Sequence, residues 1–99
     1  MNRLATIRSP RRTGALYVVL DHLSDRADGK THTTETRKTN NGLEHHEVPT
    51  EYGSALEMLG NPREWGATEI ADALTEIATE DGLGVRVGEK AIRDYRRML

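Results

Sequence analysis

The segment from Trp65 to Leu99, WGATEIADALTEIATEDGLGVRVGEKAIRDYRRML, decides which fold the chain is expected to adopt. Between Ile70 and Ala78 the apolar residues recur at helical spacing, which predicts a helix with one buried face. A second helix is expected over 88–99. Its apolar side consists of Ala91, Ile92, Tyr95 and Leu99, and its other side of Lys90, Arg93, Arg96 and Arg97.

Two short helices, the second basic on its free side, resemble the helix-turn-helix of small DNA-binding proteins of bacteria and their phages. The residues that carry the resemblance are Ile70, Ala71, Leu74, Val87, Ile92, Tyr95, Arg96 and Arg97. The resemblance covers residues 51–99, if 51–59 is the supporting first helix. The chain departs from the motif in its connection, because Thr75–Val87 stands where the motif has a short turn. Either the first helix continues to about Thr79, or a long loop follows it.

The periodicity and the resemblance together predict a mainly α protein, a small helical bundle with a C-terminal helix-turn-helix. We expect a basic flexible arm over 1–13, a helix plus a Thr-rich loop or hairpin over 14–50, and a trihelical domain over 51–99. Only 35% of the residues are hydrophobic, so the core must be small. A homodimer would be one way to enlarge it.

A helix is also expected over 14–27, where Leu16, Val19, Leu20 and Leu23 follow helical spacing. A short buried strand over 17–20 is the alternative. Another helix is expected over 51–59, with Thr50 as its N-cap. Trp65 is expected to pack across the junction before the next helix.

The segment 30–50 leaves two structures open. Its threonines favour strands, and Asn40, Asn41 and Gly42 are typical of a hairpin turn. However, its flanks offer no apolar face apart from Leu43 and Val48, and an isolated polar hairpin is marginal in water. Either a polar β-hairpin forms within 30–48, or the segment is a loop that a partner orders.

Charge along the chain favours double-stranded DNA as the partner, although the net charge is −2. The ends are basic and residues 51–85 are acidic. Lys90 and Arg93 would reach base edges or nearby phosphates, and Glu89 could accept a hydrogen bond from cytosine. The residues expected to contact DNA are Thr68, Glu89, Lys90, Arg93, Arg96 and Arg97, with Arg11 and Arg12 of the arm.

Other functional classes find little support. There is no cysteine, and the four histidines lack the spacing of a zinc site, so no metal or cofactor is expected. No nucleophile or phosphate-loop motif indicates an enzyme or a small-molecule substrate. No signal peptide or membrane span is evident, which favours the cytoplasm. The expected function is therefore a transcriptional regulator or DNA-architectural factor. The alternative is a non-enzymatic protein-interaction module, such as a phage host-takeover, packaging or virion component.

Overall fold

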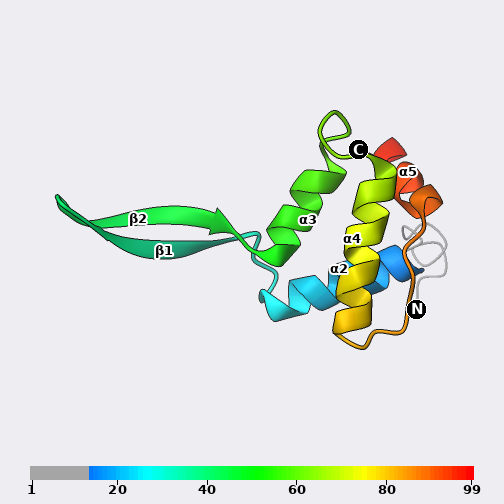
Figure 1. Cartoon of the computed structure of the whole chain (residues 1–99), viewed down its shortest axis with the longest axis horizontal. Helices are drawn as coiled ribbons and strands as arrows, with labels where there is room; N and C mark the ends of the chain where they lie inside the picture. Colours follow the sequence, from blue (N-terminus) through cyan, green and yellow to red (C-terminus); the bar gives the residue numbers. More distant parts are fainter. Residues whose placement is uncertain (1–13) are drawn as a thin grey trace, which may run out of the picture.

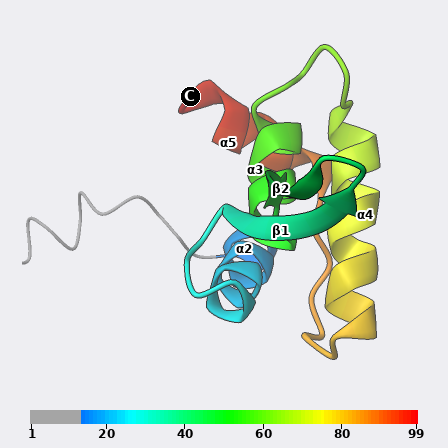
Figure 2. The same cartoon turned by 90° about the vertical axis from the view of Figure 1, so that its left-hand side faces the viewer.

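The computed structural model describes residues 14–99, which form four helices and one antiparallel two-stranded sheet (Figure 1). The order along the chain is α2 (Ala15–Arg26), β1 (His32–Thr39), β2 (Gly42–Pro49), α3 (Glu51–Leu59), α4 (Ala67–Glu80) and α5 (Glu89–Arg97). The four helices and their connections pack together and are called the helical body below. The β1–β2 hairpin extends away from it on one side, and α5 lies on the opposite side (Figure 1). Figure 2 shows the hairpin coming forward from the base of α3.

The expectation of a mainly α bundle is wrong. Helices account for 51% and strands for 19%, so the protein is a small α+β fold. The reason for the error is physical. The two strands bury almost no side chain, so their sequence has no alternation of apolar and polar residues that would predict a strand. The hairpin that the sequence left open over 30–48 does form.

The core lies where α2, α3, α4 and the start of α5 meet. The segment 14–27 is a helix, and 17–20 lies inside it rather than in a strand. Each helix supplies one apolar face, as expected for amphipathic helices in a small protein. The buried hydrophobic residues are Leu16, Val19, Leu20, Leu23, Ala55, Leu59, Ile70, Ala71, Leu74, Ala78, Val87 and Ile92.

The hairpin is defined by its turn and its base. Asn40 and Asn41 form the turn, and Thr39 pairs with Gly42, whose φ of 112° suits a residue without a side chain. At the base, the Thr50 N–H donates to the Thr31 carbonyl at 2.9 Å. The Thr50 hydroxyl donates to the Lys30 carbonyl and accepts from the Gly53 N–H as the N-cap of α3. One residue therefore joins the end of the hairpin to the start of a helix.

The connection between α4 and α5 is long, as the spacing of the two helices indicated. Helix α4 continues to Glu80 and a loop from Asp81 to Gly88 follows it, so both alternatives for this connection are found together and no tight turn joins the helices. Gly82, with a φ of 71°, ends α4, and the Leu83 N–H reaches back to the Ala78 carbonyl at 2.8 Å. The loop then returns along α4.

One side chain of α4 fixes the loop where it runs back along the helix. The Thr75 hydroxyl accepts from the Val87 N–H at 2.9 Å and donates to the Val87 carbonyl. Val87 itself is buried in the core. The loop thus brings the start of α5 back beside the start of α4, although no short turn joins the two helices.

Candidate nucleic-acid interface

Helix α5 is held against the body by its apolar side. Ile92 is completely buried, and Ala91 and Tyr95 are partly buried against the core. The rings of Tyr95 and Tyr17 lie 6.3 Å apart between centroids, which joins α5 to α2. The helix has Glu89 in its first turn and two arginines in its last turn, as the helix dipole favours. These contacts leave the opposite side of α5 facing solvent.

Three basic side chains occupy that solvent-facing side. Arg97 is 78% exposed and Arg93 is 61% exposed, and Lys90 is also exposed. Arg93 lies 3.8 Å from Glu89 and Arg97 lies 3.7 Å from Asp94, both within the helix. Exposed pairs of this kind contribute little, typically below about 1 kcal/mol. A phosphate could therefore replace either carboxylate at small cost. We call Lys90, Arg93 and Arg97 the α5 cations.

Arg96 has a different role from its neighbour in the sequence. Its Nε donates to the Leu59 carbonyl at 2.9 Å, and its Nη2 donates to the carbonyls of Met58 and Trp65 at 3.0 and 2.6 Å. The guanidinium therefore satisfies carbonyls at the C-terminal end of α3 and before α4. The geometry assigns Arg96 to holding the helices together. Trp65, expected to pack across this junction, is 37% exposed, and its backbone carbonyl is one of the three that Arg96 binds.

Thr68 and Glu89 contact each other. The Thr68 hydroxyl donates to the Glu89 carboxylate, which places the first turns of α4 and α5 side by side. Thr68 does not cap α4, because the helix begins at Ala67 with Gly66 as its N-cap. Arg11 and Arg12 lie outside the described residues. Of the residues expected to contact DNA, the structure thus brings Thr68, Glu89 and Arg93 together, and Lys90 and Arg97 lie exposed on the same helix.

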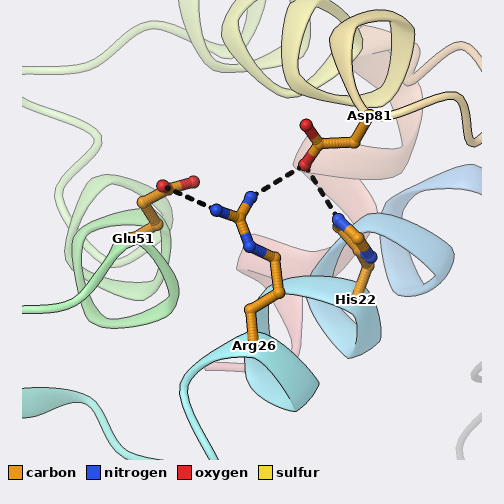
Figure 3. Close-up of polar contacts among 4 residues, drawn as sticks. All are labelled: His22, Arg26, Glu51 and Asp81. Carbon is orange, nitrogen blue, oxygen red and sulfur yellow. Dashed lines mark hydrogen bonds and ion pairs between the residues drawn. The ribbon is translucent and has the colours of Figure 1, made fainter.

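A second polar group, which the sequence did not reveal, lies on the body (Figure 3). Asp81 accepts from His22 Nε2 at 2.8 Å and from Arg26 Nη1 at 2.9 Å, and Arg26 Nη2 lies 3.7 Å from Glu51. The hydrogen bond from His22, helped by the charge of Arg26, lowers the pKa of Asp81 below its ordinary value of 3.8. His22 and Asp81 are 59 residues apart, so no spacing rule could have joined them. We call these four residues the charged cluster.

The charged cluster connects α2, α3 and the end of α4. It holds no nucleophilic side chain, so a structural role accounts for it. Within residues 14–99, no three His, Asp or Glu side chains come together as a metal site would require. In the same part of the chain, each helix is too short or too polar to cross a lipid bilayer.

Comparison with family models, with curated proteins and with solved structures finds no match to this chain.

Proposed function

We propose that this protein binds double-stranded DNA in the cytoplasm through α5, as a non-enzymatic transcriptional regulator or DNA-architectural factor. The observation that carries the proposal is the division of α5 into two sides. Ile92 is completely buried on one side, while the α5 cations are exposed on the other. A helix anchored in this way can present cations to phosphates and base edges without rearranging the body.

The α5 cations differ in what they can reach. Lys90 and Arg93 occupy the first two turns, the part of a recognition helix that normally enters the major groove. An arginine there can pair with guanine through two hydrogen bonds. Arg97 lies in the last turn and suits a phosphate. Arg96 supports this surface indirectly, because its bonds to the carbonyls around α3 hold α5 in place.

A DNA-binding titration with two matched variants tests the proposal. K90Q/R93Q removes two charges from α5, and K30Q/K38Q removes two exposed charges near the ends of the hairpin. Fluorescence anisotropy with a labelled duplex is measured over a range of salt concentrations. Each phosphate contact contributes about 0.9 to the slope of log K against log salt, so loss of two contacts lowers the slope by about 2.

The expected result is weak binding and a reduced slope for K90Q/R93Q, with K30Q/K38Q close to the unaltered chain. Equal losses in the two variants would show that only net charge matters and would contradict a role for α5. Unchanged binding of K90Q/R93Q would contradict it equally. Circular dichroism of both variants confirms that the helices remain folded.

A second candidate function is a protein-interaction module, and the exposed hairpin is the observation that favours it. Nearly all side chains of β1 and β2 face solvent, and only the base contacts the helical body. Nucleic acid that co-purifies with the chain, seen as a raised 260/280 nm absorbance ratio, would favour DNA binding. A low ratio together with concentration-dependent oligomers would favour the interaction module.

A further inference from the structure

The hairpin is long and polar and receives no support along its length. Each strand has eight residues, and all of them are exposed apart from Thr39 and Val48, which are half-buried. A two-stranded ribbon without an apolar face is marginally stable alone and gains most from additional strands. Both of its edges also present backbone groups that can pair with another strand. These features make the hairpin a surface for β-strand addition.

The register shows which amides each edge presents. Because the Thr50 N–H donates to the Thr31 carbonyl, the alternation of an antiparallel pair places the hydrogen-bonded pairs at odd-numbered residues of β1. The even-numbered residues of β1 therefore direct their N–H and carbonyl groups to the outer edge. These residues are His32, Thr34, Thr36 and Lys38. On β2 the outward positions are Leu43, His45, Glu47 and Pro49, and Pro49 has no N–H to offer.

From this edge geometry we infer that two copies of the chain associate through β1, antiparallel, with the two-fold axis at Thr36. The result is a four-stranded sheet in the order β2–β1–β1–β2. Thr36 then pairs with Thr36 of the second copy, and Thr34 with Lys38, so outward amides meet outward amides. The occupant of the edge is a second copy because β1 is complementary in charge to itself.

Charge selects this register over its neighbours. With the axis at Thr36, Glu35 of each copy lies directly opposite Arg37 of the other, and the pair occurs twice by symmetry. An axis at Glu35 or at Arg37 would place a charge opposite its own copy, which is destabilising. In the described part of the chain neither Glu35 nor Arg37 has an ion pair within 4 Å, so both can pair across the new interface.

The same register extends the charge pattern across the sheet. Within one copy Arg37 lies opposite Glu44, and Glu35 lies opposite His46. The row therefore reads Glu44, Arg37, then Glu35 and His46 of the second copy, so Arg37 has an acidic side chain on each side. The β2 edge lacks such a match, because it carries no arginine or lysine to lie opposite its glutamates.

Edge proline variants of the full chain test the inference by sedimentation velocity without DNA. Thr36 and His45 lie opposite each other, and both direct their N–H outward, on different edges. Proline at either position removes an edge donor but no backbone bond inside the hairpin. The side-chain hydrogen bond between Thr36 Oγ1 and His45 Nδ1 is lost equally in both variants, so it cannot account for a difference between them. T36P should abolish the dimer, and H45P should leave it intact. A chain that stays monomeric at high concentration, or a dimer that is lost in H45P and kept in T36P, would overturn the proposal.

Charge variants test the register itself. In E35K and in R37E, both symmetric pairs become like-charged, which should weaken self-association roughly tenfold or more. When E35K and R37E are mixed, each new charge meets an opposite charge, so the mixture should form a heterodimer. Failure of the mixture to associate would overturn the axis at Thr36. Because no step uses α5 or DNA, failure here and failure of the DNA-binding proposal can be told apart.

Discussion

The helical body and the hairpin are stabilised by different physics. The body buries an apolar face from each of its four helices, with Leu23, Leu59, Ile70 and Ile92 almost fully removed from solvent. The hairpin buries almost nothing and depends on its turn, its cross-strand pairs and the bonds of Thr50 at its base. Burial of apolar side chains therefore accounts for the order of the body, whereas the order of the hairpin rests on hydrogen bonds that an additional strand can extend.

The largest expected effect comes from the same substitution made in the two regions. Leu59 in α3 is completely buried, whereas Leu43 in β2 is 67% exposed. Leu59→Ala should lower the free energy of unfolding by about 2–5 kcal/mol, since it removes buried contacts and leaves a cavity. Leu43→Ala should change it by less than about 0.5 kcal/mol. Urea unfolding followed by circular dichroism measures both.

Similar decreases in the free energy of unfolding of the two variants would contradict this division between body and hairpin. They would show that the hairpin contributes to the same cooperative core as the helices. A measurement of Leu43→Ala at low and high protein concentration also separates an effect on folding from an effect on association.

What the sequence could predict follows the same division. The helical spacing of Leu16, Val19 and Leu23 was enough to place α2, and Thr50 was recognisable as a cap. The sequence did not decide between a hairpin and a loop over 30–48, because the turn residues favoured a hairpin while the strands lacked an apolar face. That the hairpin forms and extends away from the body could not be derived from a local pattern, and the predicted fold class was wrong for that reason.

The candidate site contains a second feature that could not be predicted from the sequence. Arg96 and Arg97 are adjacent and chemically identical, yet Arg96 bonds to carbonyls of the α3 end while Arg97 is 78% exposed. The helical spacing located the buried side of α5 through Ile92, but Leu99, expected on the same side, lies beyond the end of the helix and is 71% exposed. Only the position of α3 relative to α5 decides which of the two arginines turns inward, and that is tertiary information.

An intermediate effect is expected at Gly53, where the two regions meet. A Cβ atom on Gly53 would overlap the carbonyl oxygen of Thr31 at the base of the hairpin. Replacing a helix glycine by alanine normally stabilises by up to about 1 kcal/mol. Gly53→Ala should instead lower the free energy of unfolding by about 1–3 kcal/mol, because backbone atoms must move. Thermal unfolding gives the sign, and hydrogen exchange shows whether the amides of β1 and β2 lose protection.

Gly60→Ala is the matched control for that variant. Gly60 follows α3 with a φ of −81°, and a Cβ there would meet its nearest neighbour, the Leu56 carbonyl, at 3.4 Å. The stability of the Gly60→Ala variant should stay close to that of the unaltered chain. If Gly53→Ala were as stable as Gly60→Ala, the hairpin base would be free to move away from α3, and the two regions would be independent.

The smallest expected effect concerns the charged cluster, which joins the helices of the body without apolar contact (Figure 3). Folding lowers the pKa of Asp81, chiefly through the hydrogen bond from His22. The carboxylate therefore stabilises the fold above its unfolded pKa, and this contribution is lost as the pH falls through the folded pKa. Asp81→Asn should thus be less stable than the unaltered chain at about pH 5.5, and the difference should shrink as the pH falls below the ordinary Asp81 pKa of 3.8. In a His22→Ala background the cost of Asp81→Asn should be smaller, since the main hydrogen-bond donor to the carboxylate is already absent. A cost that persists in acid would place the role of Asp81 in the backbone at the end of α4 rather than in its charge.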